Sequence, residues 1–427
     1  MYKIQSVQID QFWHRFDAGC EFRPDVNIII GKNGTGKTTF MNILHAVLSV
    51  DLDGIASNDF ENVTITLFNG KRKRTVKVTK VDDVSYPFLM MEYQISRKKY
   101  PLRFVSTDDR RMAMHYRRRA QEESSEVRKV LSNLVSLSSL SVYRLRSSDD
   151  YEVRDRNGTR LVAPVDYRLN ELMQKLTHYQ LELSQHARLI STKLQKDVLA
   201  SILYGEEDSK AQGYQLDFDK EAEKRDLISA YSQLNAIDSG VRKKINFHVD
   251  AVDKAIVALA EINANLGKEK ESEQRVDFRS LEALRKSRKI IEMSLAAETE
   301  TTRIFSQINK FLTIARTFIE EKDFNFEGGD LVVTTKQGGL GLSDLSSGEK
   351  QLLILLTEAL LQKEAPCIFL ADEPELSLHI EWQRMIIPAI VNLNPNAQVI
   401  AATHSPEVAS NFSDAIFDME DLVNGKP

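Results

Sequence analysis

Residues 31–38 read Gly-Lys-Asn-Gly-Thr-Gly-Lys-Thr and match the phosphate-binding pattern G-x-x-x-x-G-K-[ST] at every fixed position. The glycines let backbone N–H groups turn inward around phosphate oxygens, at a helix start that already favours anions. We expect Lys37 to reach the β and γ phosphates of a nucleotide, and the Thr38 hydroxyl to ligate Mg²⁺. The phosphates are further expected to contact Asn33, Gly34, Thr35, Gly36 and Thr39.

A pair of acids near the other end of the chain supplies the chemistry that such a loop lacks. Five apolar residues, 367–371, predict a buried strand that ends at Asp372 and Glu373. Neighbouring carboxylates at a strand end point in different directions and can take different roles. We expect Asp372 to act as an outer metal ligand and Glu373 as the general base for an attacking water. A merely solvated pair would be the commoner outcome if no phosphate loop preceded it.

Two other motifs allow more than one interpretation. Residues 345–351, Leu-Ser-Ser-Gly-Glu-Lys-Gln, open a helix, where Ser346 and Gly348 form either a second anion site or an ordinary helix cap. His404, in Ala-Ala-Thr-His-Ser-Pro-Glu, ends an apolar strand from which an imidazole could meet a γ phosphate. A lone histidine at a strand end is more often only structural.

The elements that must position these residues are strands and helices in two separate stretches. Residues 1–160 are rich in strands: the N-terminus alternates, residues 25–30 form a continuous apolar run, and residues 62–81 predict a hairpin. Asn69-Gly70 in that hairpin suits a type I′ turn. From residue 325 to 427 strands and helices alternate again. These stretches predict one α/β nucleotide-binding head that is split in the sequence and rejoined in space.

Between them, residues 161–324 have helical character. Apolar positions follow steps of three and four for about three heptads. A helical core and a coiled coil that pairs with itself or with a partner both explain this seam, and we expect a helical or coiled-coil insertion. The seam consists of Leu169, Leu172, Leu176, Tyr179, Leu183, His186 and Ile190.

Composition excludes several classes of protein. The 57 Lys and Arg against 62 Asp and Glu leave a formal charge of −5, which disfavours coating nucleic acid through bulk charge. Cys20 and Cys367 lie far apart without metal-ligand spacing, as expected of reduced core cysteines. The N-terminus resembles no signal peptide, and no run of 18 apolar residues predicts a membrane span. We therefore expect a cytoplasmic protein.

The four motifs, in this order, resemble those of ABC-type ATPases, and the resemblance implies ATP and Mg²⁺ as cofactors of an ATPase that is slow and regulatory. It implies that the signature residues Ser346, Gly348 and Glu349 act on the ATP held by the phosphate loop of a second copy. His404 would be the switch histidine, and residues 374–379 the loop that links the two sites. The resemblance further implies a homo-oligomer that is at least a dimer, and a hexamer is compatible with it.

The long helical insertion is unlike a transporter head and resembles the branch that contains SMC, Rad50, RecF and OLD-type ATPases. Among these, a compact head with a short insertion resembles the ATPase subunits of prokaryotic antiphage systems, of the AriA-like (PARIS) and PtuA-like (Septu) families. That resemblance implies a separate effector, a nuclease or toxin, and a phage-encoded trigger protein.

The alternative is a RecF-like or SMC-like ATPase that acts directly on DNA in repair or recombination. Residues 97–119 carry nine Lys or Arg with tyrosines interleaved, which suits phosphate contacts, although a solvated basic loop is commoner.

Two elements of the ABC-type ATPase family have no clear match in this sequence. No glutamine for sensing Mg²⁺ occurs in residues 136–150, which leaves Gln94 as a candidate. Candidates for stacking on adenine are Trp13, His14 and Arg15.

Overall fold

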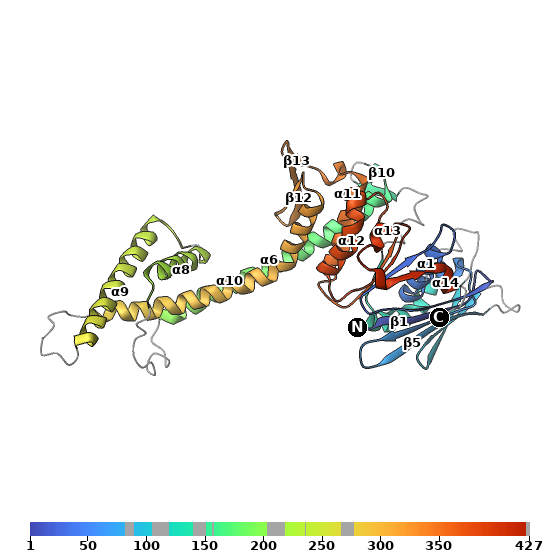
Figure 1. The fold of residues 1–427 in the computed structure, drawn as a ribbon, viewed down its shortest axis with the longest axis horizontal. Helices are drawn as coiled ribbons and strands as arrows, with labels where there is room; N and C mark the ends of the chain where they lie inside the picture. Colours follow the sequence, from blue (N-terminus) through green and yellow to red (C-terminus); the bar gives the residue numbers. More distant parts are fainter. Residues whose placement is uncertain are drawn as a thin grey trace. The chain divides into compact units, whose positions relative to one another are not determined.

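The chain forms two compact units (Figure 1). The computed structural model describes residues 1–81, 89–104, 119–139, 151–155, 158–202, 218–234, 236–265 and 277–423. One unit, the head, joins Met1–Tyr179 to Ile308–Pro427, and the other comprises Gln180–Gln307. The predicted α/β head, split in sequence by a helical insertion, is confirmed. The borders between these two units fall inside two long helices that run across them without a break. The predicted domain borders at 160/161 and 324/325 stay a prediction.

A parallel sheet at the centre of the head assembles the two halves of the sequence. Its strand order is β16-β3-β15-β14-β8, and every neighbouring pair is parallel. All residues of β14 and β15 are buried, as continuous apolar runs in a covered parallel sheet require. The carboxyl ends of all five strands therefore lie at one edge. The strands are β3 (Val26–Ile30), β8 (Leu137–Ser139), β14 (Ile368–Asp372), β15 (Gln398–Ala402) and β16 (Ile416–Asp418).

A six-stranded antiparallel sheet, of order β2-β1-β4-β5-β6-β7, forms a second layer of the head. The helix α1 (Lys37–Ser49) shares one hydrophobic core with both sheets, and Tyr93 in the antiparallel sheet donates its hydroxyl to the Val47 carbonyl at 3.2 Å. The strands are β1 (Lys3–Phe12), β2 (Phe16–Glu21), β4 (Asn62–Phe68), β5 (Lys73–Val81), β6 (Leu89–Ile95) and β7 (Lys98–Phe104).

The predicted hairpin at residues 62–81 is confirmed, but its predicted type I′ turn is wrong. Phe68 pairs with Lys73, so that four residues, 69–72, form the connection. A type I′ turn needs a positive φ at both central residues, and here only Gly70, with φ 82°, has one. The Asn69 side chain instead accepts the N–H groups of Lys71 and Arg72, which stabilises the longer loop.

The remaining elements of the head pack around the parallel sheet or extend from it. The helices α11 (Ser347–Leu361) and α12 (Ile380–Leu393) pack against each other. A three-stranded sheet consists of β11 (Asp323–Glu327), β12 (Asp330–Thr335) and β13 (Gly338–Leu340). Smaller elements are α2 (Leu52–Ser57), α4 (Ser125–Leu134), β9 (Tyr151–Asp155), β10 (Gly158–Val162), η1 (Leu342–Asp344), α13 (Pro406–Ala409), η2 (Ser413–Ala415) and α14 (Met419–Val423).

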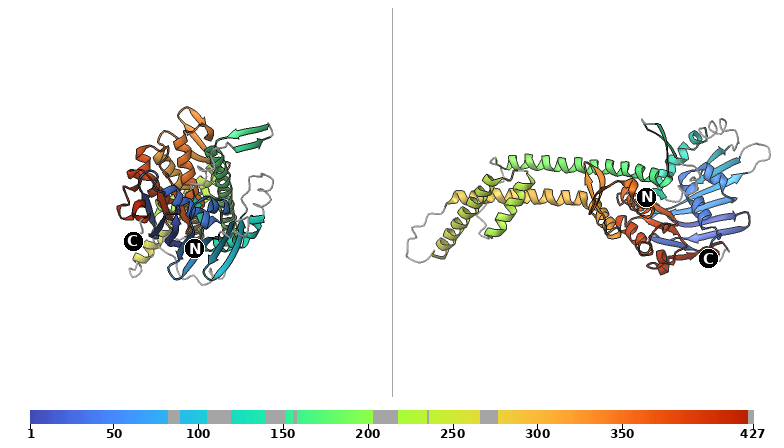
Figure 2. Two further views of the ribbon diagram at one scale, coloured as in Figure 1. Left: turned by 90° about the vertical axis from the view of Figure 1, so that its right-hand side faces the viewer. Right: turned by 90° about the horizontal axis from the view of Figure 1, so that it is seen from above.

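In the part of the insertion that the structure describes, the helices are α6 (Pro164–Ile202), α8 (Lys220–Gln233), α9 (Ser239–Asn265) and α10 (Phe278–Phe318). Within it, α6 and α10 lie side by side (Figure 2), while α8, α9 and α10 share a small apolar core. The seam positions from Leu169 to Leu183 are buried within the single chain, whereas His186 is exposed. Burial of the seam therefore needs no second chain. Among the helices that the structure describes, none has the length and apolarity to cross a membrane.

Ion pairs inside the head attach α11 to the first turns of α6. Lys350 on α11 pairs with Asp166 at 2.7 Å. Arg168 pairs with Glu358 on α11 and with Glu171 on its own helix, and the Arg168 and Glu358 side chains are only 11% and 8% exposed. Removing one member of a buried pair leaves the other charge desolvated without compensation.

We expect Arg168→Ala to lower the free energy of unfolding of the head by about 3–5 kcal/mol, because it strands the Glu358 carboxylate. The double variant Arg168→Leu/Glu358→Leu should lose much less, since no charge stays buried. Urea unfolding of both proteins measures the difference. An Arg168→Ala protein as stable as the wild type would show that the Arg168–Glu358 ion pair does not hold α6 against α11.

Candidate functional site

The phosphate loop connects β3 to α1, and its backbone depends on glycines, of which Gly34 and Gly36 lie nearest to α1. Gly34 and Gly36 have φ of 82° and 98°, in the left-handed region that glycine adopts without strain. At Gly36 a Cβ atom would lie 2.9 Å from the rings of Phe12 and Trp13. Asn33 and Gly34 are exposed at the loop tip, and Thr35 donates its hydroxyl to the Lys32 carbonyl at 2.9 Å. The loop is therefore packed on one side and open on the other.

Lys37 places its ammonium group inside this loop. The residue is only 4% exposed, and its Nζ donates to the carbonyls of Gly31 at 2.7 Å and Lys32 at 2.9 Å. Burial lowers the pKa of Lys37, while the carboxylates of Glu373 and Asp372 partly restore it. The cation is thus fixed by its own loop at the edge where the strands of the parallel sheet end.

His404 reaches the same point from the end of β15. Its Nδ1 lies 3.3 Å from Lys37 Nζ. An ammonium group can only donate, so Nδ1 must accept, and the proton of the neutral ring is on Nε2. That nitrogen lies 3.7 Å from Glu373 Oε1. The structure therefore brings Lys37, His404 and Glu373 together in one polar cluster.

The end of β14 delivers the two acids. Asp372 Oδ1 accepts the Thr38 hydroxyl at 3.4 Å, while the backbone N–H of Glu373 donates to the Ala402 carbonyl at 2.7 Å. Glu373 has a φ of 47°, so the chain turns sharply here and separates the directions of the two side chains. Thr39 follows in the first turn of α1, half-buried.

The donor set fits a magnesium ion that accompanies a nucleotide. Mg²⁺ prefers oxygen ligands, usually takes one or two from the protein, and completes its shell with water and phosphate oxygens. The Thr38 hydroxyl and the Asp372 carboxylate offer two such oxygens, 3.4 Å apart, beside the phosphate loop.

Glu375 is a residue of this site that sequence reasoning missed. One carboxylate oxygen accepts three hydrogen bonds, from the Thr403 hydroxyl at 2.6 Å and from the N–H groups of His404 at 2.9 Å and Ser405 at 3.3 Å. These bonds hold the loop that carries His404. The signal in the sequence was the third acid of Asp-Glu-Pro-Glu, which falls inside the expected linking loop at residues 374–379.

The signature residues form a capping box at the start of α11. The Ser346 hydroxyl accepts the N–H of Glu349 at 3.3 Å, and the Glu349 carboxylate accepts the N–H of Ser346 at 2.9 Å. Lys322 pairs with the same carboxylate at 2.5 Å. Burial raises the pKa of Glu349, but these hydrogen bonds outweigh it and hold the pKa below its ordinary value. Ser346 is thus a helix cap within its own chain, whatever else it contacts.

Gly348 touches the expected linking loop. A Cβ atom at this position would lie 2.4 Å from the carbonyl oxygen of Ser377, which has a φ of 64°. Glycine is therefore required at the signature for a packing reason inside one chain. The contact also fixes the signature helix against the segment that begins at Glu373.

The structure does not bring the signature to the phosphate loop of the same chain by any hydrogen bond among the described residues. Ser346 and Glu349 bond to each other instead, and Glu349 also accepts from Lys322. Gln94 lies in β6, where its amide donates to the Ser96 carbonyl at 2.9 Å, and no hydrogen bond or ion pair between residues that the structure describes links it to the metal site.

Trp13 stacks on Phe12, with ring centroids 4.8 Å apart, and this pair covers Gly36. That contact explains Trp13 as packing on the loop, while His14 lies 3.6 Å from Asp59 and Arg15 lies over the Phe16 ring. An adenine-stacking role for any of the three stays a prediction.

Most of the basic segment at residues 97–119 lies outside the described residues, including Arg117 and Arg118. Three described cations of that segment are already paired: Lys98 with Glu126, Lys99 with Glu92, and Arg119 with Glu123.

The chain as a whole matches a known protein family. A model described as "AAA ATPase domain" matches residues 2–409, almost the whole chain. The chain belongs to the AAA ATPase domain family. The predicted ATPase class is therefore confirmed.

The curated relatives of this AAA ATPase domain chain match it over short segments. They are a retron Ec83 probable ATPase of Escherichia coli (37% identity, 18% of this chain, 17% of the relative) and a retron Vc95 probable ATPase of Vibrio cholerae serotype O1 biovar El Tor (33%, 20% and 18%). A Septu protein PtuA of Bacillus thuringiensis matches at 29% identity over 18% of this chain and 23% of the relative. The match thus spans less than a quarter of each.

Among solved structures, an Smc head domain with an extended coiled coil from Pyrococcus furiosus aligns with 99% of this chain and 95% of its own. The identity is 14% and the TM-score 0.43.

We expect Glu375→Ala to lower kcat for ATP several-fold with little change in KM, because the His404 loop loses its acceptor while the hydrogen bonds of Lys37 to its own loop stay in place. The free energy of unfolding should fall by about 1–3 kcal/mol, since the buried Thr403 hydroxyl and two backbone N–H groups lose their acceptor. Steady-state kinetics and urea unfolding measure both. Glu375→Gln, which keeps an acceptor oxygen, should recover part of kcat, and a loss of stability without any change in kcat would rule out a positioning role.

Proposed function

We propose that the chain binds ATP with Mg²⁺ and hydrolyses it at the cluster of Lys37, Glu373 and His404. The observation that supports this most is the convergence of the phosphate loop, the acids and the histidine at one edge of the parallel sheet, from positions 367 residues apart. Membership of an ATPase family supports the same substrate.

Each residue has a role that its contacts allow. Lys37, with the loop amides, binds the β and γ phosphates, and Thr38 and Asp372 hold the metal, which neutralises the phosphate charge when bound. Glu373 removes a proton from the attacking water. The Nε2–H of His404 lies on the same side, where it can donate to Glu373 or to a phosphate oxygen.

The signature completes the site from a second copy in this proposal. Ser346 and Gly348 begin a helix of 15 residues, whose free N–H groups favour an anion. Since the Ser346 side chain bonds to Glu349 and not to its own phosphate loop, ATP between two heads would be the ligand that joins them. The oligomer is then at least a dimer, and a hexamer built from such contacts is compatible with it.

We further propose that ATP-driven closure regulates a separate effector, a nuclease or toxin, in the cytoplasm during antiphage defence. Within the head, α11 is tied to α6 by Lys350–Asp166 and Arg168–Glu358, and to the segment after α10 by Lys322–Glu349. Since α6 and α10 both continue into the insertion, a movement of the signature helix α11 would also move these two helices. The relatives named as retron ATPases and Septu PtuA support the defence role, with a phage protein as the trigger.

We expect Lys37→Ala to abolish ATP binding, because the loop loses its only buried cation among the described residues. Glu373→Gln should bind ATP at wild-type affinity but hydrolyse it at least about 100-fold more slowly, as removal of a general base implies. Calorimetry and phosphate release measure the two effects. A Glu373→Gln protein with wild-type turnover would disprove the general-base role.

We expect Ser346→Arg to block ATP-driven association of heads while ATP still binds the phosphate loop. The added cation and bulk occupy the place of the γ phosphate contact. Sedimentation velocity with ATP, in the Glu373→Gln background, measures association. Ser132→Arg, an exposed serine on α4, is the matched control. Unchanged association of the Ser346→Arg protein would exclude a site shared between copies.

A further inference from the structure

Gln383, in the first turn of α12, bonds to two separate loops of the head through its side-chain amide. Its Oε1 accepts the Ser405 hydroxyl at 2.7 Å, and its Nε2 donates to the Leu378 carbonyl at 3.0 Å. Because a carbonyl oxygen can only accept, the bond to Leu378 fixes which end of the amide is the nitrogen. The side chain is half-buried, and both ends of its amide are in use.

The first of these loops carries His404. Ser405 follows His404 directly, and its hydroxyl also accepts the N–H of Glu407 at 3.2 Å. Glu375 holds the N–H groups of His404 and Ser405, whereas Gln383 holds the Ser405 hydroxyl. The position of the imidazole therefore depends on a bond to α12 as well as on the bonds to Glu375.

The second is the linking loop, residues 374–379. Leu378 is buried, and its carbonyl lies one peptide after the Ser377 carbonyl that packs against Gly348 of the signature. A Cβ atom on Gly348 would lie only 2.4 Å from the Ser377 oxygen, so the loop and the signature helix cannot approach further. Gln383 thus holds the peptide next to the one that touches the signature.

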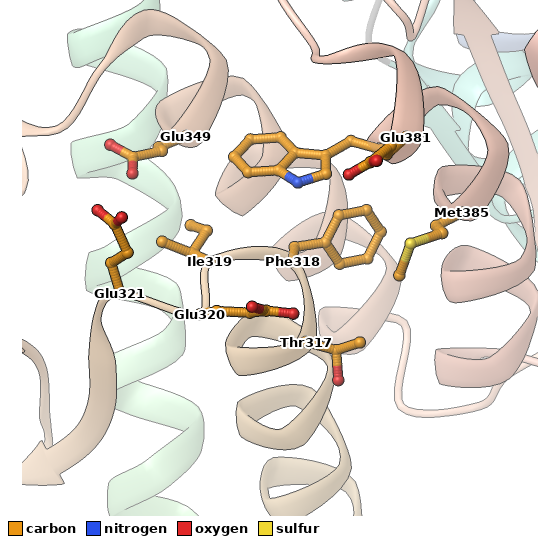
Figure 3. Close-up of a pocket in the computed structure, with 9 residues that line it drawn as sticks. Thr317, Phe318, Ile319, Glu320, Glu321, Glu349, Glu381 and Met385 are labelled. Carbon is orange, nitrogen blue, oxygen red and sulfur yellow. The ribbon is translucent and has the colours of Figure 1, made fainter.

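The helix α12 gives Gln383 a fixed position between the two loops. Trp382, its neighbour, packs edge to face on Phe318 at the end of α10, with ring centroids 6.0 Å apart and an interplanar angle of 78°. Phe318 and Met385 line the same small cavity beside this contact (Figure 3). Ile386, one turn further along α12, is fully buried. Because the helix is anchored in this way, the Gln383 amide is a fixed point against which both loops are placed.

We infer that Gln383 is a positioning residue of the ATPase, which keeps the His404 loop and the linking loop in register. The task needs a donor and an acceptor on one side chain of this length. Leucine has neither, and glutamate has only the acceptor. Gln383 itself touches no phosphate and takes no part in the chemistry.

The consequence for a second copy rests on the proposed function. There, His404 serves the ATP of its own chain, while Gly348 and the rest of the signature serve the ATP of the other chain. When His404 moves toward a bound γ phosphate, the movement reaches Gly348 through Leu378 and Ser377. Gln383 then couples the two ATP sites of a pair of heads, so that occupancy of one changes the properties of the other.

Three substitutions separate the two bonds of Gln383. Gln383→Leu keeps the approximate size of the side chain and removes both bonds. Gln383→Glu keeps an acceptor for the Ser405 hydroxyl but places a carboxylate oxygen against the Leu378 carbonyl. Arg384→Ala is the matched control, because Arg384 lies next to Gln383 and pairs with Glu407 in the segment after His404.

Hydrogen–deuterium exchange of the nucleotide-free full chain tests the bridge without any assumption about ATP. We expect Gln383→Leu to speed up exchange about threefold to tenfold in residues 374–379 and 403–407, as loss of a hydrogen bond to each loop implies. Gln383→Glu should do so in residues 374–379 only, and Arg384→Ala should leave that segment unchanged. A Gln383→Leu chain in which one segment stays at the wild-type rate, or in which the whole head exchanges faster, would overturn the bridge.

A mixture of two inactive chains then separates the effects on the two ATP sites. The Ser346→Arg chain supplies the phosphate loop and His404, and the Lys37→Ala chain supplies the signature. Gln383→Leu added to either chain should lower kcat of the mixture about threefold to tenfold at unchanged KM. Gln383→Glu should lower it only from the Lys37→Ala chain, because only the bond to the linking loop is lost.

The other outcomes are equally distinct. An effect of Gln383→Leu from the Ser346→Arg chain alone would overturn the coupling to the second site, and an effect from neither chain would overturn the positioning role. An equal loss with Arg384→Ala would show a general disturbance of α12 and would also overturn it. A parental mixture that recovers no activity would contradict the shared site of the proposed function, and the exchange experiment would then decide the role of Gln383 by itself.

Discussion

The buried ammonium of Lys37 is the constraint on which the rest of the head depends. A cation that is 4% exposed is stable only where fixed acceptors surround it, and here the acceptors are carbonyls of its own loop. Gly34 and Gly36 adopt positive φ farther along the loop, and the loop stays in place because Phe12 and Trp13 cover Gly36. The acids of β14 then balance the charge from the neighbouring strand end. One desolvated lysine thus explains why two halves of the sequence must meet at this edge.

Specific contacts connect this edge of the sheet to the signature helix and to the long helices of the insertion. Glu375 fixes the loop of His404, and the same segment leads to Ser377, whose carbonyl packs against Gly348 of the signature. The signature helix is in turn tied to α6 and to the segment after α10 by three ion pairs. A change at Glu373 therefore has a short physical route to the helices of the insertion. Within the described ranges of the chain, no comparable series of contacts links Gln94 to the metal site.

The sequence predicted those parts that depend on local pattern. The phosphate loop, the buried β14 and the helical insertion each follow from residue spacing or from runs of apolar residues, and the parallel sheet then places their ends together. It did not predict Glu375, since its role depends on where residue 403 returns in space. The predicted type I′ turn at Asn69-Gly70 was wrong, because the Asn69 side chain accepts the N–H groups of Lys71 and Arg72 and only Gly70 adopts a positive φ.

The most direct test of a site shared between copies is complementation between two inactive chains. A Lys37→Ala chain keeps an intact signature, and a Ser346→Arg chain keeps an intact phosphate loop. Mixed in equal amounts and allowed to exchange, they should form heterodimers with one complete site and recover about a quarter of wild-type ATPase activity, given random pairing of two-fold symmetric dimers. Activity that stays at the level of the separate chains would contradict the account.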